Sequence, residues 1–478
     1  MSAAAFALTA DDVRAAVGGR LLAGGGATPI EGFSIDSRTV RPGELYFAIR
    51  GERLDGHAFV QAALDKGACG AVVSTPPTGI SPAALGGRLL FAVGDTTAAL
   101  QNLARWIRRR SGAAVVAITG SAGKTTTKEI AAAFLSLRHH VLRSGGNLNN
   151  HIGLPLSLLA LRGGAEVAVV ELGMNHAGEI SRLVAIAEPD VRVWTNVAEV
   201  HTEFFASIET IADAKAEVLE GATADSVLVA NADDPLVMAR ARRFPGRIVT
   251  FGFGDADVRA VDIEDRGLDG TISRVRTPAG EAEWRVTLPG RANLANSLAA
   301  AATGLHFGIP VEAMAEAVRS LTPAAHRGEV VTLGEGVTVL DDAYNSNPRA
   351  LQAVLRVVAA DRRHGRRVAI LGEMLELGVT SVSLHEECGR SAAAAGLSCL
   401  ITVGGEPARA LGAAAIEAGL PASAVSHAPS SDRAAAIAAE AVRPGDLVLV
   451  KGSRGVRMER VVERLKARFE GGAPCSKP

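Results

Sequence analysis

Short apolar runs that end at a polar residue recur through the middle of this chain. The runs are residues 113–118, 165–170, 191–194 and 226–230, and the polar residues after the last three are Glu171, then Thr195 and Asn196, then Asn231. A mainly apolar run of this length is typical of a strand that is buried on both faces. Because open α/β sheets bind ligands at the carboxyl ends of their strands, we expect one shared site at these polar ends.

The last third of the chain repeats this pattern. Its apolar runs are residues 337–340, 367–371, 400–403 and 447–450, which lead into Asp341, Gly372, Gly404 and Lys451. Alanine-rich segments at 390–395, 408–418 and 433–442 lie between or near these runs and favour helices. The pattern predicts a second α/β unit from about residue 322.

The first hundred residues are less regular. Apolar runs at 45–49, 70–73 and 89–93 alternate with turns, and residues 74–87 are rich in Pro, Gly, Ser and Thr, which indicates a loop. A helical pattern near 96–110 then opens the central block. We therefore predict an α/β protein of three domains, at residues 1–94, 95–321 and 322–478.

Composition narrows the class of protein. The 478 residues are 48% hydrophobic and 21% charged, as in a globular protein with a large core, and the formal net charge is −1. No overall field attracts nucleic acid, so an anionic substrate needs local clusters.

The cysteines and the amino terminus indicate the compartment. Cys69, Cys388, Cys399 and Cys475 show neither close pairing nor zinc-type spacing, which predicts reduced thiols in the cytosol. Residues 1–10 do not resemble a signal peptide, and we find no apolar stretch long enough for a bilayer. We expect a cytoplasmic protein without a membrane span.

One segment carries specific chemistry. The sequence TGSAGKTTT at residues 119–127 lies between an apolar run and a helical pattern at 128–135. Such a strand, turn and helix cradle phosphate, with Lys124 reaching the terminal phosphates and Thr125 offering a hydroxyl to Mg²⁺. The common pattern begins with a glycine where this chain has Ile118, and the alternative is a plain glycine turn. The context favours ATP or GTP.

Other candidates have ordinary alternatives. Glu171 is a possible Mg²⁺ ligand or a helix-capping or surface residue. His201 follows a predicted strand but is more often structural, and Lys215 lies in a helical stretch where a lysine is normally solvated. Asn293 and Asn296 are able to cap a helix or to contact a base.

Three further polar clusters are candidate binding sites. The cluster at 341–348 is dense in hydrogen-bonding groups but also in turn-forming Asn and Pro. The motif of Asp36, Ser37 and Arg38 and the segment 51–57 suit a phosphate or a polar headgroup, and each is a weak signal alone.

Together these segments resemble the Mur ligases of peptidoglycan synthesis, from Asp36 to Glu459. The matching motifs are GNLNNHIGLP at 146–155, ELGMNHAGEI at 171–180, DAYNSNP at 342–348, GEMLELG at 372–378 and KGSRGVRME at 451–459. The glycine loop of this family lacks the first glycine of the common pattern, which fits Ile118.

The resemblance implies roles for particular residues. The ATP phosphates are expected at Gly120, Ser121, Ala122, Gly123, Lys124, Thr125 and Thr126. Thr125 and Glu171 are expected to bind one Mg²⁺, and His201 with a carbamylated Lys215 a second. The rest of the nucleotide is expected at Asn293, Asn296, Arg327, Asp342, Tyr344 and Asn347. Substrate contacts are expected at Asp36, Ser37, Arg38, Asp55, Gly56, His57, Asn149, Asn150, Lys451, Ser453 and Arg454.

The resemblance also implies a reaction and an architecture. It implies an amide ligase that activates the carboxylate of UDP-N-acetylmuramoyl-tripeptide as an acyl phosphate, with D-Ala-D-Ala as the amine. We expect a monomer that binds small molecules and no nucleic acid, with an N-terminal UDP-substrate domain, a central P-loop domain containing a parallel sheet, and a Rossmann-like C-terminal domain.

Two segments depart from the pattern of the family. Residues 202–207 read TEFFAS where a run like LEGFGS is expected, and residues 324–328 read AAHRG where the usual order is Gly then Arg. Three alternatives are weighed: the ligase that adds the third peptide residue, an enzyme similar to folylpolyglutamate synthase, and a P-loop switch or motor. The motif at 36–38 argues against the folate enzyme, and the cluster at 344–348 argues against the third-residue ligase.

Overall fold

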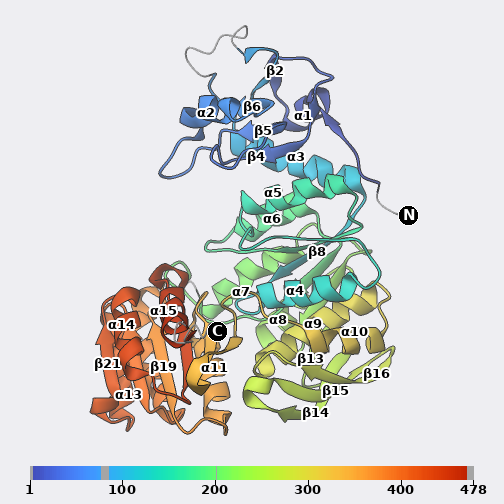
Figure 1. Ribbon diagram of the computed structural model, residues 1–478. Helices are drawn as coiled ribbons and strands as arrows, with labels where there is room; N and C mark the ends of the chain where they lie inside the picture. Colours follow the sequence, from blue (N-terminus) through green and yellow to red (C-terminus); the bar gives the residue numbers. More distant parts are fainter. Residues whose placement is uncertain (1–3, 77–84, 201, 471–478) are drawn as a thin grey trace, which may run out of the picture. The chain divides into compact units, whose positions relative to one another are not determined.

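The computed structural model describes residues 4–76, 85–200 and 202–470 (Figure 1). The chain divides into two compact units. The first unit comprises Met1–Ile118, Arg138–Arg192 and Glu217–Val227, and the second comprises Thr119–Leu137, Val193–Ala216 and Leu228–Pro478. His201, Cys475 and part of the loop predicted at 74–87 lie outside the described residues. The three domain boundaries stay a prediction.

The amino-terminal part of the first unit contains a five-stranded sheet. Its strand order is β2-β7-β6-β5-β4, with bounds Arg20–Ala23, Leu89–Ala92, Gly70–Val73, Glu44–Phe47 and Gly32–Ser34. The four strands from β4 to β7 are parallel, and β2 is antiparallel. The two-residue strands Leu8–Thr9 (β1) and Pro29–Ile30 (β3) pair separately. The helices are Ala10–Val17 (α1), Val60–Asp65 (α2) and Thr96–Ser111 (α3).

A nine-stranded sheet follows in the order β16-β15-β14-β13-β12-β11-β8-β10-β9. In chain order, the strands from β8 to β16 are Ala114–Thr119, Val141–Arg143, Val167–Glu171, Val191–Trp194, Val227–Asn231, Arg247–Gly252, Val258–Asp265, Thr271–Thr277 and Gly280–Val286. The helices from α4 to α10 are Lys124–Leu135, Gly153–Leu159, Glu179–Ala187, Ile208–Ala216, Pro235–Ala241, Arg291–His306 and Val311–Ala317. The predicted strands are confirmed, and β10 and β12 each extend over the polar residue expected to follow them.

The end of this sheet differs from the predicted parallel arrangement. Strands β14, β15 and β16 form an antiparallel meander. Buried and more exposed residues alternate along β15, because one face of the strand packs on the core while the other meets water. A two-residue turn at 278–279 is enough to join antiparallel strands, whereas parallel strands require a longer crossover.

The third sheet has six strands in the order β17-β18-β22-β19-β20-β21. Their bounds are Glu329–Thr332, Thr338–Asp342, Leu447–Lys451, Arg367–Gly372, Cys399–Val403 and Val425–Ala428. All of the pairings are parallel except that of β17 with β18. The helices from α11 to α15 are Pro348–Ala360, Ser381–Ala394, Glu406–Glu417, Ser431–Ala441 and Glu459–Glu470. The α/β arrangement predicted for the last third of the chain is confirmed.

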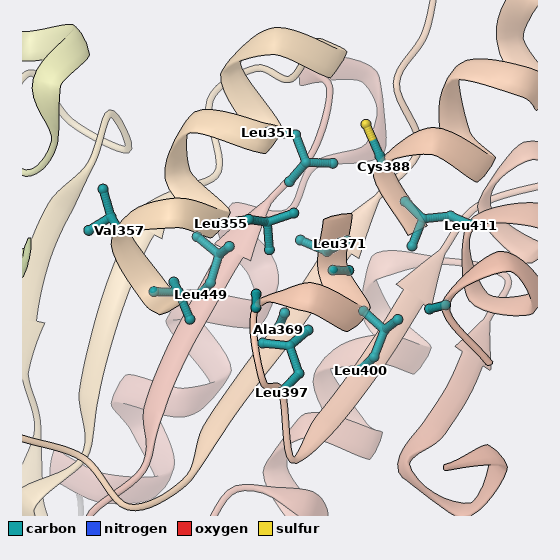
Figure 2. Packing of buried hydrophobic residues seen from close by; sticks show 14 of the residues in the cluster. Leu351, Leu355, Val357, Ala369, Leu371, Cys388, Leu397, Leu400, Leu411 and Leu449 are labelled. Atoms are coloured by element: carbon teal, nitrogen blue, oxygen red, sulfur yellow. The ribbon is translucent and has the colours of Figure 1, made fainter. Parts of the chain in front are cut away.

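Alternate residues of β19 explain why its sequence is apolar throughout. Ala369 and Leu371 belong to a cluster that contains Leu351 of α11, Cys388 of α12 and Leu411 of α13 (Figure 2). The intervening β19 residues belong to a second cluster, together with apolar residues of α14 and α15. Both faces of the sheet are therefore covered by helices. Among the described residues, no helix is long and apolar enough to cross a membrane.

Candidate functional site

The turn between β8 and α4 requires its glycines. Gly120 has a φ of 146° and Gly123 has a φ of 81°, and residues other than glycine rarely adopt these backbone angles. A Cβ on Gly120 would lie 2.0 Å from Oγ1 of Thr195, and one on Gly123 would lie 2.2 Å from Oδ1 of Asn296. The turn is therefore a tight backbone cradle, as the sequence predicted.

The polar residues after β11 hold this loop in place. The backbone amide of Ser121 donates to the Asn196 carbonyl at 3.0 Å, and that of Ala122 donates to Asn196 Oδ1 at 2.9 Å. The Thr195 hydroxyl donates to the Ala122 carbonyl at 2.7 Å. Thr195 and Asn196 were recognised as a polar strand end, but no role was predicted for them. Their position after a buried strand, in the same block as the glycine loop, is the signal that could have suggested one.

The amino terminus of α4 suits an anion. Gly123 occupies the N-cap position, and among the described residues no side chain caps the helix. The first backbone amides of a helix have no intrahelical partner, and the helix dipole places partial positive charge there. Lys124 Nζ lies above the loop, where it donates to the Gly120 carbonyl at 2.8 Å. The cradle, the helix end and this ammonium group together fit a nucleotide phosphate.

Lys215 of α7 is not an ordinary solvated lysine. Its side chain is buried, with 2% of the residue exposed. Burial, and secondarily the charge of Lys124, hold the pKa of Lys215 well below its usual range. The alternative of a solvated lysine is therefore wrong, because the side chain is buried and its surroundings disfavour the charged form.

Glu171 is the last residue of β10 and pairs in register with Ile118 of β8. Its carboxylate is buried and accepts a hydrogen bond from Asn149 Nδ2 at 2.8 Å. This strand-end position rules out the helix-capping and surface alternatives. Asn149, predicted as a substrate contact, orients this carboxylate. Oδ1 of Asn150 accepts from two backbone amides at the start of α5.

The side chains of Thr125 and Glu171 each carry oxygen atoms, which Mg²⁺ prefers. Thr125 stands in the first turn of α4, and its side chain is largely buried. Within residues 4–76, 85–200 and 202–470, no group of three His, Cys, Asp or Glu residues is arranged to hold a metal ion. The second ion predicted at His201 therefore stays a prediction.

The asparagines of α9 do not cap it. Gly290 occupies the N-cap position, and Asn293 and Asn296 lie within the helix. Asn293 Nδ2 donates to the Pro289 carbonyl at 2.9 Å, and Asn296 Nδ2 donates to Asn293 Oδ1 at 3.3 Å. The two side chains form a ladder that brings Asn296 against Gly123 of the loop.

The carboxyl ends of β18 and β22 form a second polar cluster. Lys451 Nζ forms an ion pair with Asp342 and donates to the Asn345 carbonyl at 2.9 Å. The Ser453 hydroxyl accepts from the Leu375 amide at 2.9 Å. The structure thus brings these predicted residues together at one sheet edge.

An aromatic ring and two guanidinium groups complete this second cluster. The guanidinium carbons of Arg327 and Arg454 lie 4.0 and 5.5 Å from the centroid of the Tyr344 ring. Such cation–π contacts hold both charges beside one flat surface. Asn347 lies nearby in the chain and caps α11, because its Oδ1 accepts from the Ala350 amide at 2.9 Å.

The motif at 36–38 follows β4 in the first unit. Arg38 is exposed and forms a 2.7 Å ion pair with Asp36, and its hydrogen bonds lower the pKa of Asp36 to about 2. Ser37, between them, is partly exposed. The motif therefore presents one hydroxyl and one guanidinium group to solvent.

The segment at 55–57 forms a second polar group in this unit. Asp55 Oδ1 lies 2.6 Å from His57 Nδ1, and His57 Nε2 accepts from the Ser74 amide at 2.9 Å. Gly56 is buried, and a Cβ on it would lie 2.7 Å from the Ile49 carbonyl oxygen. These contacts tie the segment to the ends of β5 and β6.

Family models match three stretches of this chain. They are the Mur ligase middle domain over residues 118–304, the Mur ligase glutamate ligase domain over residues 326–454, and the catalytic domain of the Mur ligase family over residues 29–106. The chain is also similar to UDP-N-acetylmuramoyl-tripeptide–D-alanyl-D-alanine ligase of Bacillus subtilis (strain 168). The two are 34% identical over 448 residues, which cover 92% of this chain and 93% of the relative.

Solved structures give the same result. A crystal structure of MurF from Acinetobacter baumannii matches with a TM-score of 0.86 at 29% identity, covering 97% of this chain and 99% of the other. The structure of MurF ligase from Thermotoga maritima in complex with ADP matches with a TM-score of 0.80 at 30% identity, covering 92% of this chain and 98% of the other.

Proposed function

This chain belongs to the Mur ligase family, and from that premise we propose that it joins D-Ala-D-Ala to UDP-N-acetylmuramoyl-tripeptide at the expense of ATP. The observation that carries the proposal is the likeness over nine tenths of both chains to a ligase of this name, with the phosphate loop in place. The product is the UDP-linked pentapeptide of peptidoglycan synthesis.

The reaction balances in two steps. A carboxylate oxygen of the tripeptide attacks the γ-phosphorus of ATP, the bond to the β-phosphate oxygen breaks, and an acyl phosphate and ADP form. The amine of D-Ala-D-Ala then attacks the acyl carbon, loses a proton, and displaces inorganic phosphate. The peptide is thereby activated without a covalent bond to the protein.

Charge neutralisation and positioning are the tasks of the protein in phosphoryl transfer. Lys124 and the first turn of α4 would face the phosphoryl oxygens, and the glycine turn lets the backbone approach them. Mg²⁺, held by Thr125 and Glu171, would supply a positive charge next to the phosphates. Asn149 keeps the Glu171 carboxylate oriented for this purpose.

We assign a carbamate to Lys215. Only a neutral amine adds to CO₂, and burial beside Lys124 favours that form of Lys215. Its nitrogen attacks the carbon of CO₂ and loses a proton, which leaves an anionic group with two oxygens. With His201, this group would be a ligand of a second Mg²⁺.

We assign the other substrate groups to two different parts of the chain. The Ser37 hydroxyl and the Arg38 guanidinium are proposed to bind the UDP end of the peptide substrate. The cluster at the carboxyl ends of β18 and β22 is proposed to hold the nucleotide base and the amine substrate, through Asp342, Tyr344 and Lys451.

ATP consumption distinguishes a ligase from a P-loop switch. Phosphate release is measured with ATP and Mg²⁺ alone, with the UDP-tripeptide, with D-Ala-D-Ala, and with both. Sustained turnover is expected only with both substrates, because the acyl phosphate is consumed by the amine. Hydrolysis at the full rate without D-Ala-D-Ala, or without the tripeptide, contradicts the proposal.

A further inference from the structure

His326 has a backbone conformation that suits glycine. Its φ is 61°, in the left-handed region that costs an L-residue free energy. It stands directly before Arg327, where the pattern of the family has a glycine. His326 therefore occupies a left-handed position that glycine adopts without strain.

The structure shows what holds His326 there. Its Nδ1 lies 2.8 Å from Oδ2 of Asp341, a residue with no exposed surface. Its carbonyl accepts from the Tyr344 amide at 3.0 Å, and the Gly328 amide donates to the Asp341 carbonyl at 2.9 Å. Both the side chain and the backbone around His326 are thus tied to the end of β18.

Asp341 depends on this partner as well. Burial raises the pKa of the Asp341 carboxyl, and the hydrogen bond and charge of His326 oppose that change. Within the described part of the chain, the other hydrogen bond to this carboxylate comes from the Ala343 backbone amide at 3.2 Å. Loss of a hydrogen-bond partner from a buried carboxylate costs free energy. Each member of the pair therefore stabilises the position of the other.

The residue that follows His326 is Arg327. The turn that begins at Ala324, whose carbonyl accepts from the Arg327 amide at 3.1 Å, ends in the left-handed His326. That backbone sets the direction in which the Arg327 side chain leaves the chain. The guanidinium group lies 4.0 Å from the centroid of Tyr344.

We propose that His326 and Asp341 are a positioning pair that holds Arg327 beside Tyr344 and thereby keeps the nucleotide site assembled. The inference rests on the proposed function, which assigns Arg327 and Tyr344 to the nucleotide. Without the pair, residues 326–328 relax out of the strained conformation, and the nucleotide must restore it on binding. The apparent affinity falls by the fraction of molecules that remain in the competent conformation.

The test is calorimetric titration of the full chain with ADP and Mg²⁺. His326→Ala still places an L-residue where the left-handed conformation is strained, but it removes the hydrogen bond to Asp341. ADP binding is therefore expected to weaken about tenfold. His326→Gly relieves the strain without restoring the bond, and its affinity is expected between those of His326→Ala and the wild type. His326→Asn tolerates the left-handed conformation and offers an amide donor, so it is expected within about threefold of the wild type.

His364, in the loop between α11 and β19, supplies a matched control. Its Nδ1 lies 2.9 Å from Oδ2 of buried Asp361, and its Nε2 lies 3.0 Å from the hydroxyl of Thr338, the first residue of β18. His364→Ala therefore breaks a similar pair at the opposite end of that strand. It is expected to lower the thermal stability and to leave ADP affinity unchanged.

The inference is overturned if the ADP affinity of His326→Ala equals that of the wild type, or if His326→Ala and His364→Ala lose ADP affinity equally. Failure of the proposed function is a different result, in which the wild type neither binds ADP nor forms the ligation product. The KM for the UDP-tripeptide is measured alongside, and it is expected to stay constant in His326→Ala. An equal rise in the KM for ATP and in the KM for the UDP-tripeptide also overturns the positioning role.

Discussion

At the scale of single residues, two lysines differ in their surroundings and therefore in their proposed roles. Lys124 is partly exposed and its ammonium group lies above the glycine turn, whereas Lys215 is buried and its pKa is lowered. The first is suited to face phosphate as a cation. The second is suited to react as a neutral amine.

Lys124→Ala should reduce ligation on the order of 10²-fold or more, because it removes a preorganised cation at the transferring phosphoryl group. Steady-state turnover is measured at saturating substrates, with thermal unfolding to confirm that the variant is folded. Lys466→Ala in α15 is the control and should retain full activity. Near-normal turnover of a folded Lys124→Ala protein would refute the assignment.

Lys215→Ala should be nearly inactive, and short carboxylates should restore part of its activity by replacing the oxygens of the carbamate. Activity is followed across an acetate series at fixed ionic strength, with chloride as the matched salt. An active Lys215→Ala, or equal effects of acetate and chloride, would rule out the carbamate.

Sequence reasoning predicted Lys124 but not the environment of Lys215. The loop around Lys124 is local, since strand, glycines and helix are contiguous in the chain. The burial of Lys215 results from packing by segments distant in sequence, so the residue pattern alone favoured a solvated lysine. Only the resemblance to the family implied a modified lysine at this position. The role of Asn149 in orienting Glu171 was missed for the same reason.

At the scale of elements, the first turns of two helices, α4 and α11, differ in how their backbone amides are satisfied. Among the described residues no side chain caps the start of α4, whose first backbone amides suit an anion. By contrast, α11 begins with a side-chain cap from Asn347 and a proline in its first turn. The cap places Asn347 in a structural role beside its predicted nucleotide contact.

Asn347→Ala should lower the free energy of unfolding by about 1 kcal/mol, as expected for the loss of a capping side chain, whereas Asn347→Asp keeps the cap and should stay close to the wild type. Urea denaturation of both variants measures this. If both variants unfold at the wild-type midpoint, the cap contributes nothing; if both also bind ADP normally, the nucleotide contact is wrong.

The elements were largely predictable, except where alternation replaced continuous apolar runs. The buried parallel strands of the third sheet follow the apolar runs within one or two residues, since helices cover both faces. The antiparallel strands β14 to β16 were missed because half of their residues face water, and such segments resemble loops in composition.

At the scale of the whole molecule, the phosphate loop belongs to the second unit, and the UDP end of the substrate is proposed to bind the first. The family and its reaction were predictable because five motifs occur in order along the chain. The two-unit division was not, since it depends on contacts between segments far apart in sequence.

A Ser37→Ala/Arg38→Ala variant should raise the KM for the UDP-tripeptide and leave the KM for ATP nearly unchanged, because lost binding of a remote group appears mainly in KM. Arg14→Ala is the control, since it removes another exposed ion pair, with Asp11, from the same unit. An equal rise in both KM values would instead indicate damage to the fold.

The central claim, amide formation through an acyl phosphate, is tested most directly by isotope transfer. UDP-tripeptide labelled with ¹⁸O in its terminal carboxylate is incubated with ATP, Mg²⁺ and D-Ala-D-Ala, and the products are analysed by mass spectrometry. The account predicts the pentapeptide with one ¹⁸O lost and that atom recovered in inorganic phosphate. Absence of the pentapeptide, or its formation with unlabelled phosphate, would contradict the account.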